Sequence, residues 1–261
     1  MLNSSPGSAS RIQSLFHRRK ALIAYITAGD PTPDDTPKLV EALERGGADL
    51  IELGVPFSDP IADGPVIQRG ADRALKSGTT VKKVLEMARC IREKSQIPLL
   101  LFTYLNPVLR YGLEKLARDA KAAGIDGCLL TDLSVEEAAP YAPVMRAAGL
   151  DTVFLAAPTS TAERLKLVAE YSTGFVYLVS RTGVTGERAS LSQSIEPLVA
   201  SMRAATKLPL AVGFGISTPE QARDVARVAD GVVVGSAFVR LIEKGGDVES
   251  FARQLRRGID S

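Results

Sequence analysis

Acidic side chains gather in and just after one short apolar segment of this chain. Glu52 interrupts the largely apolar residues 48–53, and Asp59 and Asp63 follow in a segment rich in proline and glycine. A carboxylate that is buried without a partner costs several kcal/mol or takes up a proton. Glu52 is therefore either an ion-pair partner or a proton-transfer group, and the two aspartates are either turn residues or part of the same site. Their grouping at the end of one strand favours a site, because α/β folds keep their chemistry there.

Glu52 and Asp63 should have different environments. Among apolar neighbours, the pKa of Glu52 should rise toward neutrality, which suits a general acid or base. Asp63 lies on a more polar loop and should stay ionised. It would then accept a hydrogen bond from a substrate N–H or stabilise a developing positive charge.

Glycines follow two late apolar segments and suggest an anion site. Gly213, Phe214 and Gly215 come after one segment, and Gly235 and Ser236 come after the next. Glycine lets backbone N–H groups approach an anion closely, and a helix N-terminus adds partial positive charge. The alternative is that these glycines only form tight turns.

A long polar segment, residues 180–190, contains glycine, serine and threonine. Ordinary loops between a strand and a helix run about 2–6 residues. The segment is therefore a candidate lid over bound substrate, or else a loop without a function.

The rest of the chain alternates between strand and helix patterns. The expected strands are 21–27, 48–53, 98–103, 127–131, 152–155, 175–179, 210–212 and 231–234. The expected helices are 34–45, 81–94, 113–123, 135–148, 162–171, 191–204, 219–228 and 248–257, with a short extra helix within 61–75. The strands are short and mostly apolar throughout, as in a parallel sheet buried on both faces. Eight such units in 261 residues predict an α/β fold, a single (β/α)8 TIM barrel domain over 1–261, with a doubly wound open sheet as the alternative.

Composition excludes several classes of protein. The net charge is +2, with acids and bases interspersed, so no nucleic-acid surface is indicated. Two distant cysteines, Cys90 and Cys128, indicate reduced thiols of a cytoplasmic protein. The single histidine, His17, argues against a metal site or a Ser-His-Asp triad. No apolar segment reaches the roughly 18 residues that span a membrane, and residues 1–9 are expected to form a loose N-terminal tail.

Several motifs together resemble those of the tryptophan synthase alpha chain family. The most specific is LIELGVPFSDPIADGP, which occupies residues 50–65 without a break. AYITAGDP (24–31), the Tyr104–Asn106–Pro107 element, YLVSRTGVTG (177–186), GFGIS (213–217) and VVGSA (233–237) occur in family order. The resemblance covers nearly the whole chain.

This resemblance implies a lyase that cleaves indole-3-glycerol phosphate to indole and glyceraldehyde 3-phosphate. Glu52 would be the general acid and base, and Asp63 would bind the indole N–H. Thr185 would be the lid residue that closes over Asp63. The other substrate-binding residues would be Tyr25, Ile67, Phe102, Leu129, Tyr177, Gly186, Phe214, Gly215, Gly235 and Ser236. Tyr25, Phe102, Leu129 and Tyr177 could equally pack the upper core of the barrel.

The family also implies a partner. Its members work as α2β2 tetramers with a beta chain that holds pyridoxal phosphate, so this chain itself would need no cofactor and no metal. Loops at the carboxyl ends of the strands, including residues 56–59, Asn106, Pro107 and Asp132, would bind the beta chain. Ser134 stands where the family often has proline, which bears on the rigidity of that surface, and Tyr25 stands where members can carry phenylalanine.

Two other functions fit parts of the sequence. Another phosphate-binding barrel, such as a sugar-phosphate isomerase or an indole-glycerol-phosphate synthase, would share the glycine loops but not the spacing of Glu52 and Asp63. A non-catalytic subunit that only activates a beta chain would have no need of a carboxylate inside a strand.

Overall fold

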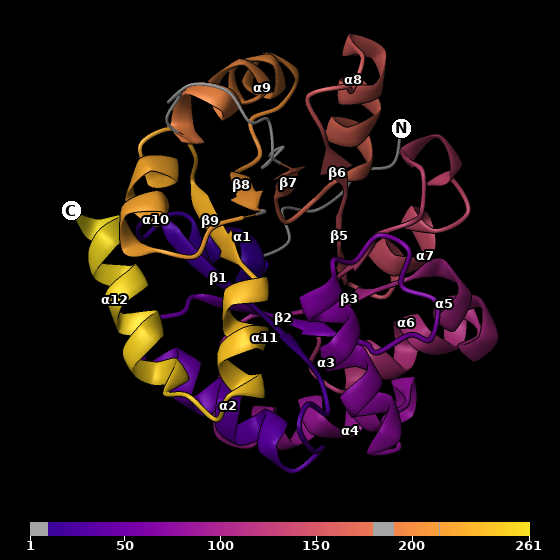
Figure 1. Ribbon diagram of the computed structural model, residues 1–261. Coiled ribbons are helices and arrows are strands. Elements are labelled where there is room, and N and C mark those ends of the chain that lie inside the picture. The colour runs from indigo at the N-terminus through magenta and orange to yellow at the C-terminus, as the bar shows by residue number, and fades with distance from the viewer. Residues whose placement is uncertain (1–9, 180–190, 214) are drawn as a thin grey trace.

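A ring of parallel strands surrounded by helices makes up the structure (Figure 1). The computed structural model describes residues 10–179, 191–213 and 215–261. The strands are β1 (Ala21–Thr27), β2 (Leu50–Gly54), β3 (Leu99–Thr103), β4 (Gly127–Leu130), β5 (Asp151–Val153), β6 (Leu155–Ala156), β7 (Val176–Val179), β8 (Leu210–Gly213) and β9 (Gly231–Val234). Their spatial order is β5-β4-β3-β2-β1-β9-β8-β7-β6, and all neighbouring strands pair in parallel.

The ring closes through Phe154. We expected one strand over 152–155, but the segment forms two short strands on either side of this residue. β5 pairs with β4, and β6 pairs with β7, so one bent segment joins both ends of the sheet. The backbone N–H of Tyr177 also donates to the carbonyl of Phe154 at 3.1 Å. A doubly wound sheet would have two separate edge strands, and the fold is therefore a (β/α)8 TIM barrel.

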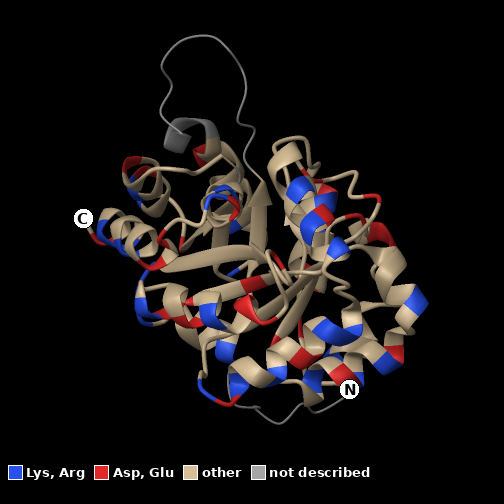
Figure 2. Ribbon diagram, turned by 60° about the horizontal axis from the view of Figure 1, so that its bottom comes forward, with Lys and Arg blue, Asp and Glu red and all other residues tan. Residues whose placement is uncertain are grey.

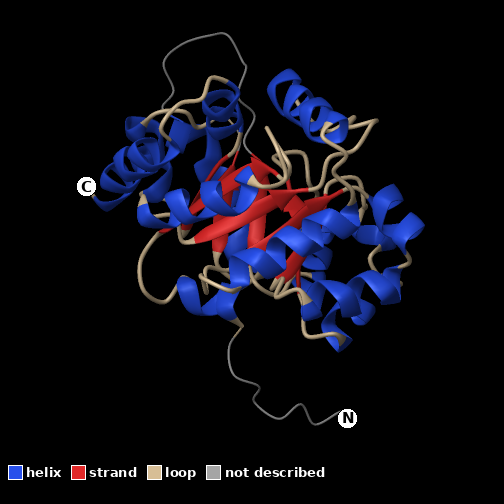
Figure 3. Ribbon diagram, turned by 90° about the horizontal axis from the view of Figure 1, so that it is seen from below, coloured by secondary structure: helices blue, strands red, loops and turns tan. Residues whose placement is uncertain are grey.

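Helices cover the outside of the ring, as the view from below also shows (Figure 3). They are α1 (Arg11–Leu15), α2 (Asp35–Arg45), α3 (Pro65–Lys76), α4 (Val81–Arg92), α5 (Leu105–Tyr111), α6 (Leu113–Ala122), α7 (Ala142–Ala147), α8 (Ala162–Tyr171), α9 (Leu191–Ala205), α10 (Pro219–Ala226), α11 (Ser236–Glu243) and α12 (Val248–Asp260), with a 3-10 turn η1 (Val135–Glu137). The expected start of α10 is confirmed: Thr218 and Gln221 form a reciprocal capping box. Charged residues of both signs intermix on the helices (Figure 2). None of the described helices has the length and hydropathy to cross a membrane.

One expected helix is wrong and three helices were not expected. Residues 135–148 do not form a continuous helix, because Pro140 and Pro143 would each remove a backbone hydrogen bond from the helix interior and disfavour it. The chain instead makes η1 and then α7, with Pro143 in the first turn of α7, where the missing N–H costs nothing. The additional helices α1, α5 and α11 are short and begin directly beside strand ends or at the chain's start.

The core has an inner and an outer layer. Alternate strand residues point into the ring, where Ile23, Leu50, Leu100 and Phe175 pack at 0% exposure. Ile12 of α1 fills the floor, so a Cβ added at Gly174 would lie 2.7 Å from its side chain. The outer layer packs the other strand faces against the helices. The interior of the ring is therefore filled, and a cavity lies above this core, at the carboxyl ends of the strands.

Candidate active site

A cavity of about 350 Å³ opens at the carboxyl end of the barrel. Nine of the expected site residues line it: Tyr25, Glu52, Asp63, Ile67, Phe102, Tyr177, Gly215, Gly235 and Ser236. They come from strands β1, β2, β3 and β7, from α3 and from the segments after β2, β8 and β9. The barrel thus brings to one place residues that lie far apart in the sequence.

Glu52 is the most unusual of these side chains. It lies in β2, paired with Tyr25 of β1 and Leu100 of β3, and it points into the ring. It is 1% exposed, and its Oε1 atom has no hydrogen-bond partner among the described residues. Burial raises the pKa of Glu52 to about 8. No cation among the described residues forms an ion pair with Glu52, so within them the ion-pair alternative is wrong. The expected rise of the pKa of Glu52 is confirmed.

Asp63 lies across the cavity on the loop before α3. It is half-buried, and the hydroxyl of Tyr104 donates to its Oδ2 atom at 2.9 Å. Burial raises the pKa of Asp63, while the bond from Tyr104 lowers it. The loop is therefore less polar than the sequence suggested. Asp59 is exposed, accepts a hydrogen bond from Ser58 and does not line the cavity, so it is the turn residue of the three acids.

Tyr104 is a site residue that sequence reasoning did not assign. Its hydroxyl both donates to Asp63 and accepts from the backbone N–H of Ala62, at 3.1 Å. Its ring packs on Phe57, with centroids 5.2 Å apart. The side chain therefore holds the Asp63 loop against the end of β3. Its place directly after a strand and its part in the Tyr104–Asn106–Pro107 element were the sequence signals.

Aromatic rings form the apolar wall of the cavity. The rings of Tyr25 and Phe102 meet edge to face, with centroids 5.1 Å apart. Glycines on the neighbouring strands make room for the two tyrosine hydroxyls. A Cβ at Gly54 would lie 2.2 Å from the hydroxyl of Tyr25, and one at Gly213 would lie 2.1 Å from that of Tyr177. These positions exclude a side chain, because real Cβ contacts are not so short.

Leu129 is the expected pocket residue that does not line the cavity. It is 0% exposed and packs with the inner core of the barrel. Its place in this core corresponds to the core-packing alternative. The remaining expected residues, Thr185, Gly186 and Phe214, lie outside the described residues and stay predictions.

The part of the cavity lining that follows β8 and β9 has the features of an anion site. Gly215 has φ +75°, and Gly235 precedes α11 without any side-chain cap on the helix. Ser236, the first residue of α11, is exposed and lines the cavity. The first N–H groups of a helix have no partner within the helix, and they point toward any anion placed there.

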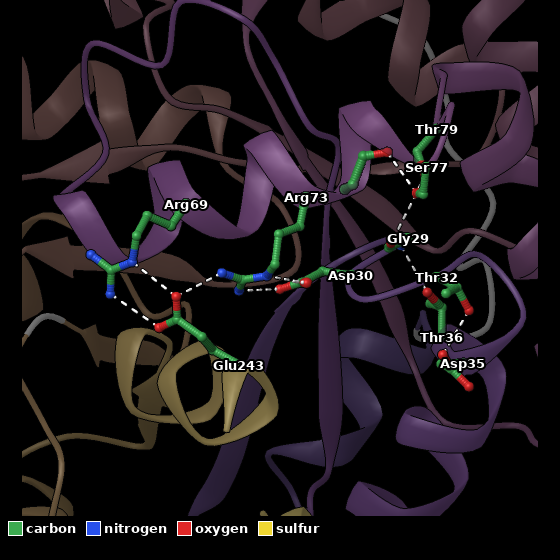
Figure 4. A network of polar contacts seen from close by, with 11 residues as sticks. Gly29, Asp30, Thr32, Asp35, Thr36, Arg69, Arg73, Ser77, Thr79 and Glu243 are labelled. Atoms are coloured by element: carbon green, nitrogen blue, oxygen red, sulfur yellow. Dashed lines mark hydrogen bonds and ion pairs between the residues drawn. The ribbon is translucent and has the colours of Figure 1, made fainter. Parts of the chain in front are cut away.

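A buried ion pair fixes α3, the helix that carries Ile67 of the cavity lining. Arg73 of α3 binds both carboxylate oxygens of Asp30, at 2.7 and 2.8 Å, and Asp30 is 1% exposed (Figure 4). A two-pronged bond of this kind fixes orientation as well as distance. It ties α3, and with it Ile67, to the loop after β1.

Comparison with known proteins agrees with these motifs and this fold. The profile of the family described as "Tryptophan synthase alpha chain" matches residues 13–258. The chain is 69% identical to the tryptophan synthase alpha chain of Solibacter usitatus (strain Ellin6076), over 95% of this chain and 98% of that protein. This chain belongs to the tryptophan synthase alpha chain family.

Other members of the tryptophan synthase alpha chain family extend the likeness. The alpha chain of Citrifermentans bemidjiense is 51% identical over 96% of this chain and 97% of its own length. Two solved structures have the same fold. A tryptophan synthase structure from Mycobacterium tuberculosis gives a TM-score of 0.88 at 38% identity, over 97% of this chain and 99% of that one. The tryptophan synthase subunit alpha from Legionella pneumophila str. Paris gives a TM-score of 0.86 at 38% identity, over 97% of this chain and 99% of that one.

As a tryptophan synthase alpha chain family member, the chain is a carbon–carbon lyase of tryptophan biosynthesis. It cleaves indole-3-glycerol phosphate to indole and glyceraldehyde 3-phosphate, and the indole goes to a beta subunit. Membership excludes the other phosphate-binding barrel enzymes and the purely activating subunit that parts of the sequence allowed.

Proposed function

We propose that the cavity binds indole-3-glycerol phosphate with its indole ring against Tyr25, Phe102 and Tyr177. The phosphate group then lies at the start of α11, beside Gly235 and Ser236. Glu52 and Asp63 perform the cleavage between these two ends. The observation that carries this assignment is the burial of Glu52 without a hydrogen bond to Oε1, because such a carboxyl group holds a proton near neutral pH.

In this mechanism Glu52 first acts as an acid and then as a base. Its proton goes to C3 of the indole ring, which leaves Glu52 as a carboxylate and the ring nitrogen positively charged. The carboxylate then removes the proton from the glycerol hydroxyl next to C3. The oxygen electrons form the aldehyde C=O, the C–C bond breaks, and its electrons return to the indole ring. Glu52 ends protonated, so the cycle needs no other proton donor.

Asp63 stabilises the charged intermediate. Protonation at C3 places positive charge on the ring N–H, and a carboxylate that accepts a hydrogen bond from it lowers the barrier. Tyr104 is a positioning residue, since it holds Asp63 in place through the 2.9 Å bond. Thr185 and Gly186 are proposed to close over the substrate, with Gly186, Phe214 and Gly215 adding backbone groups to the phosphate site. Ile67 completes the apolar wall, and Leu129 supports it from below.

The direct test is Glu52→Gln in the purified chain, with indole release as the readout. We expect at least about 100-fold loss of turnover, the usual range for a lost proton-transfer group. The matched control is Asp59→Asn, because Asp59 is an exposed acid on the same loop that does not line the cavity. The control should keep full activity. Near-normal indole release by Glu52→Gln would reject the assignment.

The partner belongs to the same proposal. The chain pairs with a tryptophan synthase beta chain in an α2β2 tetramer, and the beta chain carries the pyridoxal phosphate. Two exposed apolar side chains support a docking surface at the cavity rim, Ile61 at 86% and Leu109 at 61% exposure. The N–H of Leu105 donates to Asp132 at 2.7 Å and joins two of the expected docking loops. Ser134 directly precedes η1 there, and its hydroxyl donates to Glu136.

A cytoplasmic location and a single domain over 1–261 stay predictions.

A further inference from the structure

Arg240 is the one cationic side chain among the described residues that line the cavity. The acids on the same lining are Glu52 and Asp63. A phosphate ester carries about −1.5 to −2 charges near neutral pH, whereas a helix N-terminus supplies only about half a positive charge. The described lining therefore has little positive charge for a phosphate, apart from that of Arg240.

Arg240 lies on the face of α11 that looks toward the expected phosphate position. It follows Ser236 by four residues, and residues four apart share one face of a helix. Long helical side chains also lean back toward the N-terminus of their helix. The exposed side chain of Arg240 lines the same cavity as Gly235 and Ser236.

No other residue neutralises Arg240 within the described part of the chain, where it forms no hydrogen bond or ion pair. Its natural partner would be Glu243, three residues later on the same helix. Glu243 instead accepts from Arg69 of α3 at 2.9 and 3.1 Å and from Arg73 at 2.8 Å. Figure 4 shows its carboxylate between these two arginines. The hydrogen bonds from Arg69 are the largest cause that lowers the pKa of Glu243 to about 2. The Glu243 carboxylate therefore stays charged and bound to the two arginines of α3.

The arginines of α3 are fully used in this network. Arg73 also binds the buried Asp30, so two arginines face two acids (Figure 4). Neither Arg69 nor Arg73 lines the cavity. The network therefore satisfies Glu243 from the neighbouring helix and leaves the positive charge of Arg240 available.

We propose that Arg240 binds the phosphate group of the substrate, and that the Arg69–Glu243–Arg73 network keeps Arg240 free to do so. This rests on the proposed placement of the phosphate beside Gly235 and Ser236. The phosphate does not change during cleavage, so the contact is equal in the ground state and the transition state. Such a contact lowers KM and leaves kcat unchanged.

The test compares Arg240→Gln, Arg240→Lys and Arg257→Gln in the full-length chain. Arg257 is a matched control: it is exposed on α12, forms no ion pair in the described structure and does not line the cavity. Its variant removes the same charge from the molecule. We expect Arg240→Gln to raise KM for indole-3-glycerol phosphate about tenfold at low salt, the scale of one partly screened charge-assisted hydrogen bond. Its kcat should match the wild type, Arg240→Lys should recover most of the affinity, and Arg257→Gln should change neither constant.

Inorganic phosphate separates this inference from the proposed function. Its inhibition constant should rise in Arg240→Gln, and binding of indole alone should not change. The KM of the wild type should also rise more steeply with salt than that of the variant. Equal KM values in Arg240→Gln and Arg257→Gln, or a fall in kcat without a change in KM, would overturn the role of Arg240. Those outcomes leave the roles of Glu52 and Asp63 intact, because these depend on the Glu52→Gln result.

Discussion

The hydroxyl of Tyr104 donates a 2.9 Å hydrogen bond to the Oδ2 atom of Asp63. The bond joins the loop after β2 to the start of α5, and Tyr104 itself is 2% exposed. Burial raises the pKa of Asp63, and the bond from Tyr104 opposes that rise. A half-buried acid thereby stays closer to its ionised state and in a fixed direction. Both properties matter for a group that must face a developing positive charge.

Removal of this bond should shift the pH dependence of the reaction. In Tyr104→Phe the pKa of Asp63 should rise further, because the interaction that lowers it is gone. Asp63 then takes up its proton at higher pH, and the acid limb of kcat/KM should move upward by about one pH unit. A pH–rate profile measures this. Tyr111→Phe is the matched control, since Tyr111 makes a similar 2.9 Å bond to Asp119 and does not line the cavity. A pH–rate profile identical to that of the wild type would show that the bond from Tyr104 does not lower the pKa of Asp63.

The buried Glu52 should make the stability of the protein depend on pH. Its pKa is about 8 in the folded chain against the ordinary 4.5 of a glutamate side chain, so the folded state holds the proton more tightly. The stabilisation is complete at low pH and is lost as the pH rises toward 8. Relative to Glu52→Gln, the free energy of unfolding of the wild type should fall by about a few kcal/mol between acid pH and pH 8. Urea unfolding at several pH values measures the difference, and parallel curves for the two proteins would contradict the raised pKa.

Much of the barrel could be predicted because each strand carries its own signal. Short apolar runs marked β1, β2 and β9, and Thr218 with Pro219 marked the start of α10. Glu52 was recognisable because a lone acid in an apolar run is costly wherever the run is buried. Asp63 was predicted as part of the site for a different reason, because it follows the Glu52 strand on the next loop.

The features that were missed depend on contacts between distant segments. Nothing near Phe154 predicts that the strand must bend there to meet both β4 and β7. The bond from Tyr104 to Asp63 spans 41 residues, and that from Arg69 to Glu243 spans 174. Leu129 resembles a pocket residue in sequence and pairs with Phe102, which lines the cavity, but packing across the ring covers Leu129.

The floor of the barrel should contribute to stability without affecting catalysis. Ile12 is 0% exposed and fits between Gly127 and Gly174 at the end opposite the cavity. Ile12→Ala should lower the free energy of unfolding by about 2–4 kcal/mol, because the neighbouring glycines cannot fill the space. Ile61→Ala is the matched control, since Ile61 is 86% exposed. Urea unfolding of both variants gives the comparison, and kcat of folded Ile12→Ala should equal that of the wild type. Equal stability of the two variants would mean that α1 does not close the barrel.

The exposed apolar rim should matter only when a beta chain is present. Leu109 of α5 and Ile61 lie on segments joined through Tyr104, whose hydroxyl accepts the N–H of Ala62. Leu109→Asp should weaken binding to a tryptophan synthase beta chain at least about tenfold, since it places a charge in an apolar contact. Titration calorimetry measures the affinity, with Gln254→Asp on exposed α12 as the control. Indole release by the isolated variant should not change, because Leu109 does not line the cavity. If Leu109→Asp binds the beta chain as tightly as the control does, the docking surface lies elsewhere on the barrel.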